Sequence, residues 1–138
     1  MSAIVPPAVV ADTHTLIWLL FEPSRLSADA KAALTNAEAS GAPIHVSSVS
    51  IIELRDLVDK GKFTEADYGA VLAVLRDPTA APTVVPLDTD NADALNLIAR
   101  ADVPDMPDRI IAATARYLGL PLITRDRKIQ ACGIPTIW

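Results

Sequence analysis

The segment Ala8–Thr15, with the sequence AVVADTHT, contains the first predicted strand and the first acidic residue of the chain. A short unbroken apolar run is typical of a strand that is buried on both faces of a parallel sheet. Asp12 then lies where this strand ends and a helical pattern begins. In open α/β sheets, ligands bind just beyond the carboxyl ends of the strands. Asp12 is therefore equally well explained as a helix cap and as part of a binding site.

Apolar strand-like segments alternate with helical patterns along the rest of the chain. We expect strands over residues 8–12, 43–47, 83–87, 121–124 and 134–138, and helices over 13–21, 28–40, 51–60, 65–77, 90–101, 107–118 and 127–132. Strands that alternate with helices form a mostly parallel sheet with helices on its faces. Pro86 favours an edge position for the third strand. The prediction is one α/β domain over residues 1–138, a three-layer α/β/α sandwich around a roughly five-stranded, mostly parallel sheet.

Composition narrows the functional classes. The chain has 138 residues, a net charge of −5, 51% hydrophobic residues and a single cysteine, Cys132. One cysteine allows no disulfide framework, no apolar run reaches the ~18–20 residues of a membrane span, and residues 1–7 lack a signal-peptide pattern. We therefore expect a cytoplasmic protein whose apolar surface is partly covered by a partner or a second copy. The negative net charge argues against a protein that binds nucleic acid through a basic surface. It does not exclude an enzyme that binds phosphates through metal ions.

Three further acidic residues lie past the end of a predicted strand or at the start of a predicted helix. Glu53 ends the sequence SIIE of residues 50–53, which is a capping-box pattern, yet apolar neighbours place it at the edge of the core, where a carboxylate needs a partner or a cation. Asp108 opens a strong helical pattern, with Asp105 three residues earlier as a candidate cap. Asp126 directly follows the fourth predicted strand. Each acid alone is compatible with a capping role.

Taken together, the four acids predict a cation site. Carboxylates that meet at one edge of a sheet repel one another strongly unless a cation lies between them. Oxygen ligands suit Mg²⁺, and the cysteines and paired histidines that would indicate zinc are missing. We expect His14, next to Asp12, to have an orienting or structural role.

The segments that contain these acids also resemble a known family. The sequences DTH (12–14), VSSVSIIEL (46–54), DMPDRIIAATA (105–115) and LITRD (122–126) have the order and spacing found in PIN-domain ribonucleases, and most closely in the VapC-type toxins of bacterial toxin–antitoxin pairs. The ending IPTIW (134–138) is also similar to the family. Relatives often have Asp-Pro-Phe-Asp-Arg in the third segment, where this chain has its proline one position later. We therefore expect a slightly altered loop and an intact site.

The resemblance implies a single PIN-like domain that acts as an endoribonuclease, the toxin of a toxin–antitoxin pair. The implied catalytic and metal-binding residues are Asp12, Glu53, Asp108 and Asp126. They would bind Mg²⁺ or Mn²⁺, whose activated water hydrolyses RNA phosphodiester bonds. Thr13, Ser47 and Thr124 are candidates for orienting ligands or water. The implied partners are a structured RNA such as tRNA or rRNA, a cognate VapB-type antitoxin and a second copy of the chain in a homodimer.

Several alternatives stay open at the level of sequence. Arg109, Arg125 and Arg127 lie near the acids and are candidates for contacting substrate phosphate, but they equally fit a solvated basic face or ion pairs. Instead of an enzyme, the chain could be a non-catalytic PIN-like module that binds RNA or protein. It could also be a phosphohydrolase that forms an aspartyl-phosphate on Asp12, although His14 stands where that pattern needs a second aspartate. Metal-activated water does not need the 2′-hydroxyl, so the site chemistry does not separate RNA from DNA.

Overall fold

A computed structural model describes residues 7–138. The prediction that residues 1–7 lack a signal peptide therefore concerns residues outside the described part, except for Pro7. The elements, in chain order, are β1 (Val9–Ala11), α1 (Thr13–Phe21), the 3₁₀ helix η1 (Pro23–Arg25), α2 (Ala28–Ala39), β2 (Ile44–Ser47), α3 (Ser48–Asp59), α4 (Glu65–Arg76), β3 (Pro82–Val85), α5 (Thr89–Asp93), the 3₁₀ helix η2 (Ala94–Leu97), α6 (Met106–Leu118), β4 (Leu122–Ile123), α7 (Arg127–Gln130) and β5 (Thr136–Ile137). Between residues 7 and 138, no helix has the length and apolar character needed to cross a membrane.

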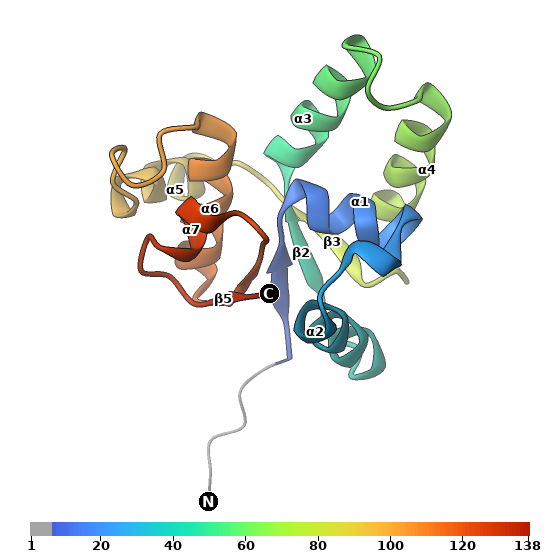
Figure 1. The fold of residues 1–138 in the computed structure, drawn as a ribbon, viewed down its shortest axis with the longest axis horizontal. Helices are drawn as coiled ribbons and strands as arrows, with labels where there is room; N and C mark the ends of the chain where they lie inside the picture. Colours follow the sequence, from blue (N-terminus) through green and yellow to red (C-terminus); the bar gives the residue numbers. More distant parts are fainter. Residues whose placement is uncertain (1–6) are drawn as a thin grey trace, which may run out of the picture.

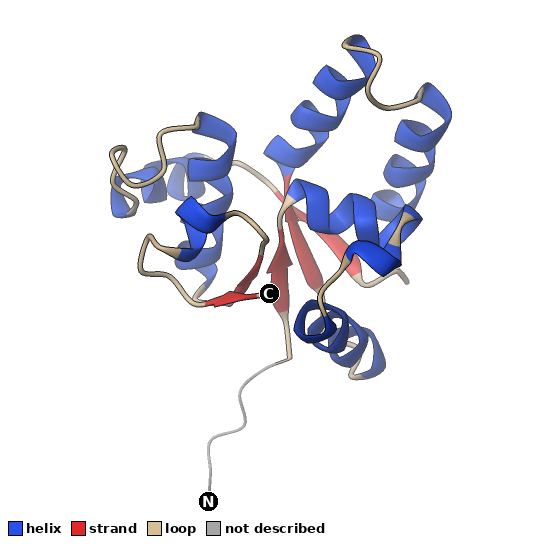
Figure 2. Cartoon of the chain, in the orientation of Figure 1, coloured by secondary structure: helices blue, strands red, loops and turns tan. Residues whose placement is uncertain are grey.

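The five strands form one parallel sheet in the order β3-β2-β1-β4-β5. Figure 2 shows the strands in red between two groups of helices. The unbroken apolar run is the central strand β1, in which Val10 lies opposite His45 of β2 and Leu122 of β4. β3, which Pro86 follows, is an edge strand, as predicted. Because all five strands point the same way, all of their carboxyl ends lie at one edge of the sheet.

Helices cover both faces of the sheet and create the three predicted layers (Figure 1). Val10 and Leu122 face a core formed with α6, α7 and the α5–η2 segment. Their neighbours Val9 and Ile123 face the opposite core, which α1 and α2 cover. This alternation follows the two-residue period of a strand. α3 and α4 stand beside α1 as a helical pair (Figure 1). A third apolar cluster joins these helices to β2, and its buried members are Leu16, Val46, Leu54 and Val71.

α3 begins three residues earlier than the sequence pattern predicted, directly after β2. Its N-cap is Ser47, whose Oγ accepts a hydrogen bond of 3.2 Å from the backbone N–H of Val49. Ser50 therefore lies inside the helix, where its hydroxyl is 2.8 Å from Thr13 Oγ1. The capping-box explanation for Glu53 is wrong, because Ser50 is not at the helix start. Glu53 is instead on the second turn.

The predicted helix over residues 90–101 is wrong beyond residue 97. At Ile98 the backbone becomes extended and the side chain turns into the core. The guanidinium of Arg109 donates to two carbonyls of this segment, from Nε to Ile98 O at 2.8 Å and from Nη2 to Leu95 O at 3.1 Å. Carbonyls at the end of a helix need such donors. Arg109 thus holds the start of the loop before α6, which does not support its predicted contact with substrate phosphate.

Candidate active site

Two of the predicted site residues follow neighbouring strands and cap the helices that come next. The Asp12 carboxylate, after β1, accepts a hydrogen bond of 2.8 Å from Thr15 N–H. The Asp126 carboxylate, after β4, accepts one of 3.0 Å from Ile129 N–H. Each of these caps uses a single oxygen, Oδ1, so capping is compatible with binding a ligand through the same carboxylate. The two explanations that the sequence left open for Asp12 are therefore not exclusive.

Asp108 approaches the same edge from the first turn of α6. Asp105 caps this helix by accepting a 3.1 Å hydrogen bond from Asp108 N–H. Burial raises the pKa of Asp108 from 3.8 to about 7, and the negative charges of Asp105, Asp126 and Glu53 add to this rise. The positive end of the helix dipole acts in the opposite direction. Burial and repulsion between carboxylates therefore outweigh the helix at this position.

Glu53 reaches the site from α3 and is half-buried. Its Oε1 accepts a hydrogen bond of 2.6 Å from Thr13 Oγ1, and Thr13 is also bonded to the hydroxyl of Ser50. Burial raises the pKa of Glu53, the bond from Thr13 opposes this rise, and the charges of Asp105 and Asp12 add to it. Thr13, next to Asp12 in the sequence, thus positions the carboxylate of a different helix.

A cavity of about 500 Å³ at this edge brings three of the four predicted acids together. Its lining residues are Asp12, His14, Trp18, Arg25, Asp108, Arg125 and Asp126. Glu53 does not line this cavity, although its charge acts on Asp108. The sequence analysis missed Trp18 and Arg25. Trp18 stands one helical turn after His14, a spacing that was visible in the sequence, whereas nothing in the sequence placed Arg25 here.

The other predicted residues lie at different positions relative to the cavity. Arg125 lines the cavity, and its guanidinium carbon lies 6.0 Å from the centre of the Trp18 ring. Arg127 is exposed and is not part of the lining. Thr124 is buried and its Oγ1 accepts a 3.0 Å hydrogen bond from the backbone of Asp126, so it supports that acid from behind. Ser47 caps α3.

The donor set fits a hard divalent cation in charge and chemistry, because three carboxylates face one cavity. Among residues 7–138, no group of three or more acidic, histidine or cysteine side chains is preassembled in a geometry that would hold a metal ion. Carboxylates without a cation between them repel, and this favours separated side chains.

Comparison with known proteins identifies the family to which this chain belongs. The PIN domain family model matches residues 9–134. Ribonuclease VapC22 of Mycobacterium tuberculosis is 29% identical over 133 residues, which are 94% of this chain and 98% of that protein. A toxin–antitoxin complex from Klebsiella pneumoniae superposes with a TM-score of 0.58 at 26% identity, covering 94% of this chain and 96% of that one. VapBC2 from Rickettsia felis, bound to a promoter DNA fragment, shares the fold with a TM-score of 0.69 at 14% identity and the same coverage. Since the family model spans nearly all of the described residues, this chain belongs to the PIN domain family and is similar to its VapC-type toxins.

Proposed function

We propose that this chain is a metal-dependent endoribonuclease, the toxin component of a toxin–antitoxin pair, which hydrolyses RNA phosphodiester bonds. The observation that carries the proposal is the convergence of Asp12, Asp108 and Asp126 on one cavity, each from a different element. Membership in the PIN domain family and the similarity to a protein named as a ribonuclease support it.

The residues of the site have different proposed roles. Asp12, Asp108 and Asp126 would hold Mg²⁺ or Mn²⁺, with Glu53 completing the set directly or through water. When bound, the cation supplies a water nucleophile at neutral pH and neutralises charge on the phosphodiester. Arg125, at the cavity, donates to a substrate phosphate, for which the planar guanidinium is well suited.

The substrate is proposed to be structured RNA, such as tRNA or rRNA, cut within a single-stranded region. The chain carries a net charge of −5, so non-specific attraction to phosphates is weak. Selectivity must then come from the shape of the RNA and from unpaired loops whose bases are accessible.

The proposed partners are a cognate VapB-type antitoxin and a second copy of the chain, in a cytoplasmic setting. The solved structures of similar fold include a VapBC complex from Salmonella typhimurium and a VapBC complex from Mycobacterium tuberculosis. Among residues 7–138, several large apolar side chains are exposed, of which Ile52 on α3 is the most exposed at 65%. Exposed apolar groups of this size are candidates for an interface.

The proposal is tested by incubating total cellular RNA with the protein in Mg²⁺ or in EDTA. The key variant is Asp12→Asn, because asparagine caps helices as well as aspartate and keeps the start of α1 intact. The matched control is Asp88→Asn, which changes the N-cap of α5, where Asp88 accepts a 2.9 Å bond from Asn91 N–H. We expect Asp12→Asn to lower the cleavage rate by at least about 100-fold, since loss of a ligand exceeds the loss of a supporting residue.

The controls separate the alternatives. EDTA should abolish cleavage, and Asp88→Asn should cleave like the wild type. Equal cleavage by Asp12→Asn and the wild type would remove the site from consideration. RNA binding without cleavage by the wild type would indicate a non-catalytic module, covalent phosphate on Asp12 would indicate a phosphohydrolase, and equal cleavage of single-stranded DNA would show that the enzyme does not select RNA.

A further inference from the structure

A second cavity of about 500 Å³ adjoins the acidic one. It lies between α1 and the turn that joins α3 to α4. The two cavities share three lining residues, which are His14, Trp18 and Arg25. The two cavities therefore adjoin at these three residues. An RNA strand bound at the carboxylates would pass these residues to reach the second cavity.

Part of the wall of the second cavity is aromatic and apolar. Phe21 of α1 and Phe63 of the α3–α4 turn face each other edge to face, with ring centres 5.9 Å apart. Ile17 and Leu57 extend the apolar lining. Its volume lies within the range of about 300–1,000 Å³ that is usual for ligand pockets. Aromatic side chains of this kind are the surfaces on which proteins stack unpaired RNA bases.

The charges around the second cavity cancel, unlike those around the first. Apart from His14, the charged lining residues are Arg25, Lys62, Glu22 and Asp67, two of each sign. Arg25 is paired with Glu22 at 3.7 Å. A neutral, aromatic hollow with polar groups at its rim suits an uncharged base and offers little attraction to a phosphate.

The junction between the two cavities carries positive charge, in contrast to the neutral second cavity. The guanidinium carbon of Arg25 lies 5.0 Å from the centre of the Trp18 ring, and that of Arg125 lies 6.0 Å from it. Trp18 itself is only 7% exposed, so it serves as a fixed support for both cations. The His14 ring lies 5.7 Å from Trp18 on the exposed side of the first turn of α1. Two arginines held at the border of an acidic cavity are placed to bind phosphates that flank the one being cleaved.

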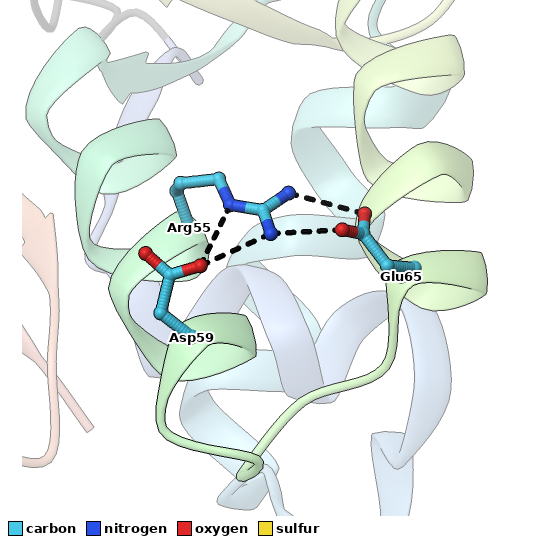
Figure 3. Close-up of polar contacts among 3 residues, drawn as sticks. All are labelled: Arg55, Asp59 and Glu65. Carbon is cyan, nitrogen blue, oxygen red and sulfur yellow. Dashed lines mark hydrogen bonds and ion pairs between the residues drawn. The ribbon is translucent and has the colours of Figure 1, made fainter.

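Ion pairs join the two helices on either side of the α3–α4 turn. Figure 3 shows Arg55 of α3 between Asp59 of the same helix and Glu65 at the start of α4. Its two Nη atoms bond both oxygens of Glu65, at 3.1 and 2.8 Å. Gly61 makes the turn itself possible with a backbone φ of +71°, which side chains of L-residues disfavour. Phe63 of this turn lines the cavity and packs against the apolar cluster of α1, α3 and α4.

We propose that this second cavity is a nucleobase pocket for single-stranded RNA, and that Arg25 and His14 guide the strand into it from the carboxylate site. The proposal rests on the proposed function and deepens it by assigning residues that recognise the substrate. Phe63 supplies the stacking surface, Arg25 contacts the phosphate beside the scissile one, and His14 lies between the two cavities. Selectivity for unpaired RNA then follows, since a base in a duplex is not free to enter the pocket.

The test compares two fluorescently labelled decamers in EDTA by anisotropy: oligouridine and an abasic ribose-phosphate strand that carries the same phosphates without bases. The wild type should prefer oligouridine by about 5- to 100-fold, the usual effect of stacking one base. Phe63→Leu keeps an apolar side chain but removes the ring, so it should lose this preference while binding the abasic strand unchanged. Arg25→Gln should weaken both strands equally and lower the slope of log Kd against log salt by about 0.7. The matched control is Arg100→Gln, an exposed arginine outside both cavities.

The outcomes separate this inference from the proposed function. Equal melting temperatures for wild type and Phe63→Leu establish that the variant is folded. If Phe63→Leu then keeps the full preference for oligouridine, the base pocket is wrong, while cleavage of RNA by the wild type and its loss in Asp12→Asn leave the proposed function standing. If Arg25→Gln binds like Arg100→Gln, the assigned path of the strand is wrong. If the wild type does not cleave RNA at all, the proposed function is the part that fails.

Discussion

Two groups of charged residues in this protein differ in how their charges are balanced. On the α3–α4 pair, Arg55 bonds Asp59 and Glu65 at distances between 2.8 and 3.3 Å (Figure 3). Contact with Arg55 lowers the pKa of Glu65. At the carboxyl edge of the sheet, burial and mutual repulsion raise the pKa of Asp108 and Glu53. Within residues 7–138, no salt bridge involves the acids of that edge.

The difference separates a structural cluster from the proposed functional one. Arg55 and its partners are exposed and satisfied, and such pairs add little to stability because water already solvates them. The carboxylates at the sheet edge are partly buried and unneutralised, which destabilises the fold unless a ligand compensates. A half-buried acid with a strongly raised pKa in a cavity is a recognised mark of a functional site.

The largest expected effect is on catalysis and comes from Asp108→Asn. It should lower Mg²⁺-dependent RNA cleavage by at least about 100-fold, since it removes a proposed ligand. At pH 8 and without metal, the same variant should unfold at a temperature equal to or higher than that of the wild type, because a repelling charge is gone. Initial rates and thermal melts measure the two effects. Arg55→Ala is the comparison variant, and a similar loss of cleavage there would show that the two clusters do not differ as described.

An intermediate effect is expected in the pH dependence of stability. The pKa of Asp108 is about 7 in the folded protein and 3.8 in its ordinary state, so the unfolded chain releases this proton first as the pH rises. The contribution of Asp108 to stability is therefore fully present below pH 3.8 and is lost as the pH rises through about 7. Urea unfolding of the metal-free protein between pH 5 and 8 should show this decline. It should be smaller in Asp108→Asn, in which only the raised pKa of Glu53 still contributes.

A divalent cation provides the control for this pH effect. At pH 8, Mg²⁺ at ten times its dissociation constant should stabilise the wild type by about 1.4 kcal/mol, and Asp108→Asn by less. A decline of the same size in Asp108→Asn as in the wild type would assign the pH effect to another group. Stabilisation by Mg²⁺ that is equal in both proteins would place the cation elsewhere.

The smallest expected effect comes from Arg55→Ala, measured as the free energy of unfolding. The variant should be slightly less stable at low salt, and the difference should shrink in 1 M NaCl because exposed ion pairs are screened. Unfolding in urea at 0.05 and 1 M NaCl measures it. A difference that survives high salt would instead indicate packing of the guanidinium on Tyr68, whose ring centre lies 5.2 Å away.

Local patterns in the sequence predicted the parts of the site that depend on chain order. An apolar run that ends in an acid identified both a central strand and a helix cap, and this is why Asp12 and Asp126 were found. The parallel sheet then brought them to one edge. The helix start at residue 48 was missed because Ser47, Ser48 and Ser50 are all plausible caps, and only the end of β2 decides between them.

Contacts between distant segments were not predictable in the same way. Arg109 was expected at the substrate because it follows Asp108, yet its guanidinium reaches carbonyls 11 and 14 residues earlier. Arg25 enters the acidic cavity through its position over Trp18, which no spacing along the chain encodes. Long side chains cross such distances easily, so their partners depend on packing and not on neighbours in the sequence.

Asp12 and Asp126 are both helix caps and proposed metal ligands, and this double role has a genetic consequence. Asparagine can replace the cap but lacks the negative charge, so it preserves the helix start while removing an anionic ligand. Aspartate and asparagine codons differ by one base. A single nucleotide change at either position therefore separates the architecture of this protein from its proposed chemistry, whereas alanine at the same position would impair both.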